Sequence, residues 1–198
     1  MESIHNYIER KINRRKDGSL IFPADFRGEG SATAIKMTLS RLAATGKLRR
    51  VAHGIYYKPK KDPLFGELLP APEKVAETIA RKEKIHIKPS GAYALHQLGL
   101  TTQVPTRLLY LTDGQRRQIN IGKTQINFKP TTSKKMALEG PVSSLVIQAL
   151  DELGTATLNE EVKRKIKSLL EKENPALLKK DLTLAPAHIH DYILKLLK

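Results

Sequence analysis

The sequence contains no cysteine and no tryptophan, and only 5% of its 198 residues are aromatic. Without cysteine the chain can form neither disulfides nor thiolate zinc sites, and a reducing cytoplasm is compatible with it. It has no run of about eighteen apolar residues, so no transmembrane helix is expected. Its first residues, MESIHNYIERK, carry charges where a signal peptide would be apolar. We therefore expect a soluble, cytoplasmic protein.

Acidic residues are also scarce relative to basic ones. The chain has 20 Asp and Glu against 35 Lys and Arg, a net charge of +15. Residues 1–61 hold 14 basic and 5 acidic residues, whereas residues 62–198 hold 21 and 15, so the first third carries most of the excess. This imbalance predicts a polyanionic partner, with nucleic acid ahead of an acidic membrane surface.

Hydrophobic periodicity and turn signals divide residues 1–61 into a short series of elements. Ile4, Tyr7, Ile8 and Ile12 recur at helical spacing, and Ser3 is a candidate cap. The expected elements that follow are a short extended piece at Leu20–Phe22, a helical turn at Pro23–Phe26, a helix at Ser31–Thr45 that ends at Gly46, and two strands at Leu48–Ala52 and Ile55–Lys58 joined across His53-Gly54.

This order of helix, short strand, short helix, helix and hairpin is that of a winged helix-turn-helix. The segment Lys47–Pro63, KLRRVAHGIYYKPKKDP, would contain the wing. Its apolar residues, Val51, Ile55 and one of the two tyrosines, would pack inward, and its cations would face outward. We predict an α+β protein with this DNA-binding domain at residues 1–61, a proline-rich linker at 62–72 and a mixed α+β domain with a helical C-terminal tail at 73–198.

The predicted DNA contacts lie on two elements of the first domain. A helix N-terminus offers free N–H groups to phosphate, and small residues let a helix enter the ~12 Å major groove. The candidates are Ser31, Thr33, Lys36, Met37, Ser40 and Arg41 on the helix and Lys47, Arg49, Arg50, His53 and Lys58 around the wing. Two alternatives stay open, since Met37 can belong to the core and Arg41 can pair with a carboxylate. If ~6–10 phosphates are neutralised, affinity should fall ~10³–10⁵-fold between 50 and 200 mM salt.

The second domain is expected to alternate helices and strands. The predicted helices are Glu73–Lys84, Ala92–Leu98, Pro141–Leu153, Leu158–Lys172 and Ala185–Leu197, and the predicted strands are Ile85–Ile87, Arg107–Thr112, Gln118–Ile121 and Thr124–Phe128. The last two strands would form a tight hairpin across Gly122-Lys123.

No catalytic or metal-binding constellation stands out in this domain. Ser90 lies six residues before His96, but Pro-Ser-Gly is the usual chemistry of a helix start, so capping is the favoured reading. His86, His96, His188 and His190 lack the spacing of metal ligands, and there is no Gly-rich phosphate loop. We expect no catalytic residue, no metal and no cofactor, and hence not an enzyme.

Two stretches resemble a known family. They are SLIFPADF…GSATAIKMTLSRLAATGKLRRVAHGIYYKP and KPSGAYALHQLGLTTQVPTRLLYLTDGQRRQINIGKTQINFKP. Together they resemble the AbiEi-type antitoxins of abortive-infection toxin–antitoxin systems, which are transcriptional regulators with an N-terminal winged helix-turn-helix. The resemblance covers roughly residues 1–155. The wing and the run from Ala94 to Pro105, with the pattern AxxxLGLTTQVP, carry most of its specificity.

The resemblance implies a two-part role. The first domain would bind operator DNA and repress its own operon, with the recognition helix at Ser31–Thr45 and the wing at Leu48–Lys58. The second domain would oppose a nucleotidyltransferase-type toxin without a stable complex, and the run from Ala94 to Pro105 would be structural. The oligomeric state stays open.

The resemblance also relates the second domain to restriction-endonuclease-like folds, whose Mg²⁺ chemistry needs carboxylates on neighbouring strands. After Asp113 this sequence has amides at those positions: Gln118, Asn120, Gln125 and Asn127. An active nuclease is therefore not expected, and it remains an alternative together with an RNA-binding basic protein. The few aromatic residues offer little stacking surface for single strands, which favours duplex DNA.

Overall fold

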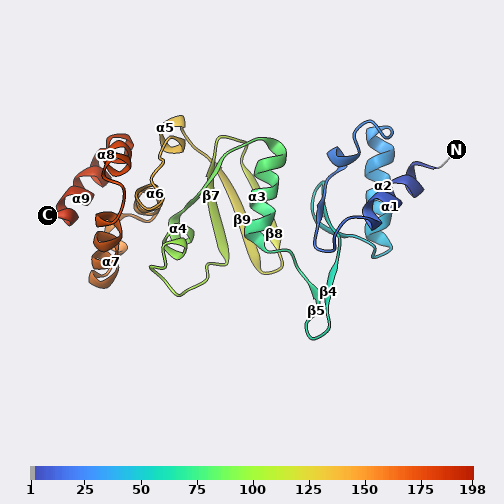
Figure 1. Cartoon of the computed structure of the whole chain (residues 1–198), viewed down its shortest axis with the longest axis horizontal. Coiled ribbons are helices and arrows are strands. Elements are labelled where there is room, and N and C mark those ends of the chain that lie inside the picture. The colour runs from blue at the N-terminus through green and yellow to red at the C-terminus, as the bar shows by residue number, and fades with distance from the viewer. Residues whose placement is uncertain (1–2) are drawn as a thin grey trace. The chain divides into compact units, whose positions relative to one another are not determined.

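The computed structural model describes residues 3–198, which form a mixed α+β fold (Figure 1). The chain divides into two compact units. The N-terminal unit extends to Thr78 and includes residues 119–123, and the C-terminal unit contains residues 79–118 and 124–198. None of the helices in the described part of the chain combines the length and the apolar character needed to cross a membrane.

The N-terminal unit follows the expected order of elements. They are α1 (Ile4–Asn13), β1 (Leu20–Ile21), the 3-10 helix η1 (Pro23–Phe26), α2 (Ala32–Ala44), β2 (Arg49–Ala52) and β3 (Ile55–Tyr57). The hydroxyls of Ser3 and Ser31 cap α1 and α2 by accepting hydrogen bonds of 3.2 Å from the N–H groups of Asn6 and Ala34. Gly46 follows α2 with φ at +75°, which confirms the predicted end of this helix.

The helices and the sheet of this unit share one hydrophobic core. Its buried residues are Ile8, Ile12, Ile21, Phe26, Ile35, Leu39, Leu42, Leu48 and Tyr56. The predicted inner stripe of α2, Ile35, Leu39 and Leu42, therefore faces the core. Thr38, which is 5% exposed, is also buried on this side of the helix.

Strand β3 lies between β1 and β2 in a three-stranded antiparallel sheet. Ile21 and Arg50 flank Tyr56, and Leu20 and Arg49 flank Tyr57. We expected only one of the two tyrosines to be packed inward. Tyr56 belongs to the core, as expected for one of the two, and Tyr57 lies on the opposite face of β3. Tyr57 is nevertheless buried, with 2% exposed, because β3 is the central strand and the segment at Gly18 covers its hydroxyl side.

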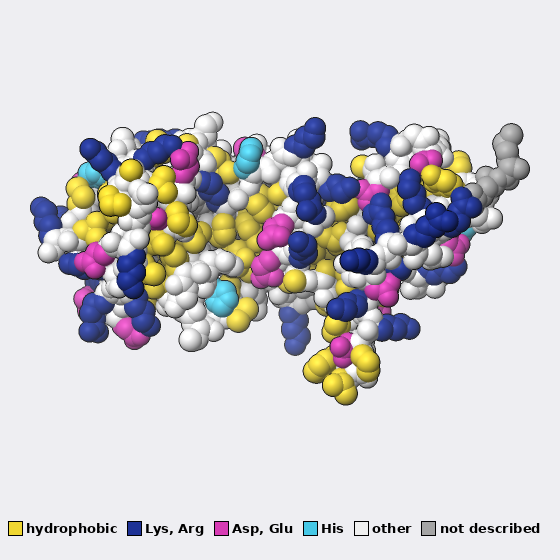
Figure 2. Space-filling model, in the orientation of Figure 1, with side chains coloured by type: hydrophobic (Ala, Val, Ile, Leu, Met, Phe, Trp, Pro, Cys, Tyr) yellow, Lys and Arg dark blue, Asp and Glu magenta, His cyan; other side chains and the backbone are white. Residues whose placement is uncertain are grey.

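A second hairpin occupies much of the segment that we expected to be a linker. Strands β4 (Lys60–Asp62) and β5 (Gly66–Leu68) form a two-stranded antiparallel sheet of their own. The Asp62 carboxylate accepts hydrogen bonds from the N–H groups of Leu64 at 2.9 Å and Phe65 at 3.0 Å, which fixes the turn. These two side chains are 88% and 78% exposed, and Figure 2 shows hydrophobic atoms at this tip.

The C-terminal unit combines one four-stranded sheet with helices. Helix α3 (Pro72–Glu83) crosses the boundary between the two units. The other elements are β6 (Ile87–Ser90), α4 (Gly91–Gln97), β7 (Arg107–Thr112), β8 (Arg117–Ile121), which also crosses the boundary, β9 (Thr124–Pro130), α5 (Ser133–Met136), α6 (Ser143–Leu153), the 3-10 helix η2 (Thr155–Thr157), α7 (Glu160–Glu171), α8 (Pro175–Leu184) and α9 (Ala187–Leu197).

The strand order in this sheet is β6-β7-β9-β8, and β7 runs parallel to β9. Tyr110 of β7 is the register partner of Phe128 of β9, and their rings stack with centroids 6.0 Å apart. Tyr93 of α4 meets Tyr110 edge-on at 5.2 Å. Because successive side chains of a strand alternate between faces, Leu109 and Asn127 lie on the opposite face from these rings.

The helices after the sheet enclose a second core, which contains Ile147, Leu150, Ile166, Leu170, Ile189 and Ile193. Two buried carboxylates bind the loop that leads into α6. Asp181 accepts hydrogen bonds from the N–H groups of Glu139 at 2.8 Å and Gly140 at 2.9 Å, and from the hydroxyl of Ser143 at 2.6 Å. Glu173 accepts from the N–H groups of Val142 at 2.7 Å and Ser143 at 3.0 Å.

Some local expectations for this unit were wrong. Ser90 precedes α4, but its hydroxyl donates to the backbone oxygen of Gln148 at 3.1 Å and does not cap the helix. The strand expected at residues 85–87 begins only at Ile87. Helices α5 and α8 were not predicted. From the run that begins at Ala94, Ala94 and Leu100 are buried, whereas Val104 is 74% exposed.

Candidate nucleic-acid interface

The outward side of α2 carries five of the predicted contact residues. Thr33, Lys36, Met37, Ser40 and Arg41, called the α2 face below, are all exposed, because the inner stripe of the helix faces the core. Met37 is 49% exposed, which excludes the alternative that it belongs to the core. Ser31 lies at the start of this face, where its hydroxyl caps the helix.

The cations of the α2 face are available for a ligand. Within residues 3–198, neither Lys36 nor Arg41 forms a side-chain hydrogen bond or an ion pair. Arg41 therefore pairs with no carboxylate of the described residues, contrary to the alternative in which it only neutralises one. Two unpaired cations on one exposed helix face can bind anions without first breaking internal contacts.

A hollow of about 260 Å³ lies beside the start of α2. It is lined by Pro23, Ala24, Arg27, Gly28, Gly30, Ala32, Ile35 and Lys36. Arg27 was not among the predicted residues, although it lies only four positions before Ser31. It is exposed and, like Lys36, has no partner in the part of the chain that the structure describes. The N-terminus of a helix bears partial positive charge, so this hollow favours an anionic group.

Four of the predicted residues around the β2–β3 hairpin are exposed, but each already contacts another side chain of the N-terminal unit. Lys47 forms an ion pair with Glu9, and this hydrogen bond lowers the pKa of the Glu9 carboxyl. Arg49 binds Glu67 at 2.8 Å, and the guanidinium of Arg50 lies 3.1 Å from Nδ1 of His53. Exposed ion pairs contribute only ~0–1 kcal/mol, so a phosphate group can replace these carboxylates at little cost.

Lys58 differs from the other predicted contacts. Its ammonium group donates to the backbone oxygens of Asn13 at 3.0 Å and Arg15 at 2.6 Å, and it forms an ion pair with Asp17 at 2.9 Å. These three contacts use all three donors of the group. Lys58 thus ties β3 to the end of α1, and we leave it out of the interface proposed below.

Basic side chains are numerous on the N-terminal unit. Figure 2 shows Lys and Arg side chains spread over the face of this unit that is in view, with fewer acidic ones among them. The excess of basic residues in 1–61 is therefore matched by basic side chains on the visible surface of this unit.

The residues considered for metal or nuclease chemistry do not gather into one site. Across residues 3–198 no group of three or more His, Asp and Glu side chains is placed to hold a metal ion. Asp113 is bound to His86, whose ring Nδ1 lies 2.7 Å from the carboxylate and whose backbone N–H donates at 2.8 Å. These hydrogen bonds lower the pKa of Asp113. These contacts tie the turn between β7 and β8 to the segment that precedes β6.

Comparison with known proteins gives a family but no activity. The model of a family of unknown function, DUF6088, matches residues 7–178. A search of curated proteins found no match.

Proposed function

The chain belongs to DUF6088, a family of unknown function, and we propose that it is a DNA-binding transcriptional repressor that acts on its own operon. The single observation that carries this proposal is the α2 face, an exposed helix side with two unpaired cations next to a basic hairpin. Duplex DNA presents a regular array of phosphates and a groove that accepts one helix.

We also propose that the N-terminal unit is a winged helix-turn-helix. The support is the order of its elements together with the pairing of β1 against β3, which joins the first strand to the hairpin. In this arrangement η1 and α2 form the helix-turn-helix, α2 is the recognition helix and β2–β3 is the wing. The α2 face would read the major groove, and Arg50 and His53 would follow the neighbouring backbone or minor groove.

We propose further that the protein is the antitoxin of a toxin–antitoxin system. This part rests on the resemblance of residues 1–155 to the AbiEi-type antitoxins and not on a site in the C-terminal unit. The partner would be a nucleotidyltransferase-type toxin encoded beside it. Expression of that toxin should arrest growth, and co-expression of this chain should restore it. Continued arrest would contradict the antitoxin role but would leave DNA binding intact.

A band-shift titration of the full chain with the DNA upstream of its own gene tests the repressor proposal. At about 150 mM salt we expect a preference of at least about 10³-fold over random duplex. No preference over random duplex would contradict sequence-specific binding. Stronger competition by structured RNA than by duplex would favour the RNA-binding alternative over the proposal.

Variants of the α2 face make this test specific. Lys36→Ala and Arg41→Ala should each weaken binding by ~1–3 kcal/mol if they contact base edges, because each removes an unpaired cation from the interface. Both positions are exposed, so the thermal stability should not change. Lys134→Ala, which removes an exposed cation from α5, is the matched control. Unchanged affinity in both α2 variants would exclude this face.

A further inference from the structure

The sheet of the C-terminal unit has one apolar and one polar face at its β8–β9 edge. Ile119, Ile126 and Phe128 are buried on the apolar face. The side chains that alternate with them include Gln118 of β8 and Asn127 and Lys129 of β9, which lie on the other face. A polar sheet face does not by itself indicate a ligand, because it can simply face solvent, but this face also contains a hollow.

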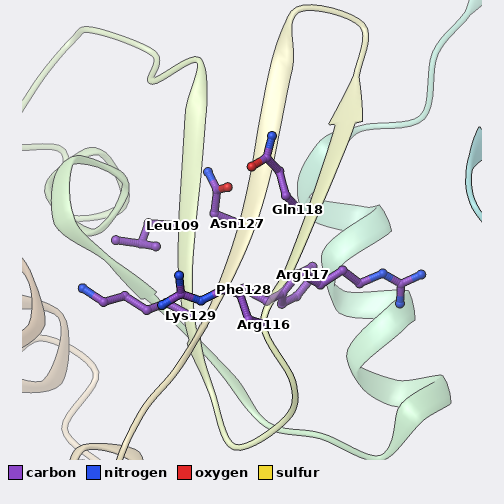
Figure 3. A pocket seen from close by; sticks show the side chains of 7 residues that line it. All are labelled: Leu109, Arg116, Arg117, Gln118, Asn127, Phe128 and Lys129. Carbon is purple, nitrogen blue, oxygen red and sulfur yellow. The ribbon is translucent and has the colours of Figure 1, made fainter.

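The hollow has a volume of about 390 Å³ and is lined by Leu109, Arg116, Arg117, Gln118, Asn127, Phe128 and Lys129 (Figure 3). This volume lies within the ~300–1,000 Å³ that is typical of small-molecule sites. The lining supplies three cations, two carboxamides and the apolar side chain of Leu109, whereas the ring of Phe128 is buried on the other face of the sheet, and none of the lining residues is a carboxylate. Its charge therefore suits an anion.

The three cationic side chains that line the hollow extend in two different directions. Figure 3 shows Arg116 and Lys129 extending to the same side, whereas Arg117 extends away from them toward α3. Arg117 binds Glu83 at 2.6 Å. Arg116 is exposed and forms no side-chain hydrogen bond or ion pair with any described residue. Lys129 pairs with Glu152 at 2.7 Å, an exposed contact that a phosphate group can replace.

The carboxamides provide a second, directional part of the hollow. Figure 3 shows the amide groups of Gln118 and Asn127 near each other on neighbouring strands. Asn127 donates from Nδ2 to Oε1 of Gln125 at 3.1 Å, which orients its amide and leaves Oδ1 as an acceptor. Gln118 is exposed and forms no side-chain hydrogen bond within residues 3–198. Such amides match the donor and acceptor pattern of a nucleobase edge, adenine above all.

From this combination we propose that the hollow binds a nucleotide unit. The phosphate lies against Arg116 and Lys129, and the base edge is bound by Asn127 and Gln118. The half-buried side chain of Leu109 provides an apolar contact for the base or the sugar. The nucleotide unit can be a free nucleotide or part of a single strand, since both present the same phosphate and base.

This site is independent of the proposed DNA-binding function, because none of its lining residues belongs to the α2 face. The test uses the full chain with adenosine monophosphate, adenosine, inorganic phosphate and a short adenine-rich single strand as probes. Calorimetric titration gives each affinity, and the thermal shift checks that binding stabilises the folded chain. Adenosine monophosphate should bind at least about tenfold more tightly than adenosine or inorganic phosphate, since it alone of these three engages both halves.

The variants assign the binding to the hollow. Arg116→Gln should weaken adenosine monophosphate at least about tenfold by removing a charge-assisted contact, and Asn127→Ala should reduce its advantage over inorganic phosphate. Lys134→Gln removes the same charge outside the hollow and should leave the affinity for adenosine monophosphate unchanged. Lys36→Ala should likewise leave this affinity, and its advantage over inorganic phosphate, unchanged. If only the single strand binds, and Arg116→Gln weakens it, the nucleotide unit belongs to a strand.

Three results would overturn the proposal. The first is that no probe binds, and the second is that inorganic phosphate binds as tightly as adenosine monophosphate. The third is that Arg116→Gln and Lys134→Gln have equal effects. If the unchanged protein binds adenosine monophosphate but shows no preference for its upstream DNA, the proposed repressor function is rejected and the nucleotide site is not.

Discussion

At the scale of single residues, some buried carboxylates of this protein hold the fold, and some exposed cations have no partner among the described residues. Asp181 and Glu173 are 0% and 7% exposed, and both accept several hydrogen bonds from the loop before α6. Lys36, Arg41 and Arg116 are exposed cations without partners among the described residues. Burial with satisfied hydrogen bonds stabilises a fold, whereas unpaired exposed charge is available to a ligand.

The Glu173 carboxyl makes the stability of the C-terminal unit depend on pH. Burial raises its pKa, but N–H groups of Ser143, Val142 and Asn174 donate to the carboxylate and outweigh burial, so its pKa lies below the ordinary 4.5. A lowered pKa stabilises the fold above pH 4.5, and this contribution is lost as the pH falls through the lower, folded-state pKa.

Glu173→Gln should therefore lower the free energy of unfolding by ~1–3 kcal/mol at neutral pH and flatten the loss of stability in acid. Thermal unfolding followed by circular dichroism across the acid range measures both effects. Glu171→Gln, at the exposed last position of α7 and two residues before Glu173, is the control and should behave as the unchanged protein. A Glu173→Gln variant with the original acid dependence would contradict the role of this carboxylate.

At the scale of elements, helix α2 combines a structural cap with a binding face. Ser31→Ala should destabilise the N-terminal unit by about 1 kcal/mol, because the N–H group of Ala34 loses its acceptor. Ser40→Ala, on the exposed middle of the same helix, should be neutral or slightly stabilising, since alanine has the higher helix propensity. Chemical denaturation of the two variants measures the difference, and equal stabilities would contradict the capping role.

Most elements of the fold could be predicted from the sequence, and the exceptions have physical reasons. The face of α2 followed from its apolar spacing and its caps. Hairpin β4–β5 was missed because its strands are three residues long and its turn depends on Asp62 rather than on a hydrophobic pattern. Helix α8 was missed because the buried Asp181 interrupts its apolar stripe, although Asn174 and Pro175 form a readable start signal.

The candidate site was less predictable than the elements that carry it. Which residues face outward on α2 follows from periodicity, but the partners of cations follow from contacts between distant parts of the chain. Lys58 is bound by backbone oxygens of Asn13 and Arg15, more than forty positions away, and local sequence gives no sign of this. Arg27 was missed because it precedes the helix and belongs to no periodic pattern.

At the scale of the whole molecule, the net charge of +15 is shared by two compact units: the N-terminal unit holds 16 basic and 9 acidic residues, and the C-terminal unit holds 19 and 11. The N-terminal unit presents the α2 face and the β2–β3 hairpin, and the C-terminal unit presents the hollow at Arg116 and Asn127. Binding of a duplex by the first unit should follow counterion release, so its affinity should depend steeply on salt. The two sites can be tested in the same full-length protein, because each has its own variants.

The most direct test of the central claim, that the α2 face and the adjoining hairpin bind duplex DNA, is the affinity for the upstream DNA as a function of salt. If ~6–10 phosphates are neutralised, the plot of log affinity against log salt should have a slope of about −5 to −9, and Lys36→Ala should reduce its magnitude by about one if Lys36 contacts a phosphate. A nearly flat plot, or variants at Lys36, Arg41 and Arg50 that keep both the affinity and the slope of the unchanged protein, would contradict it.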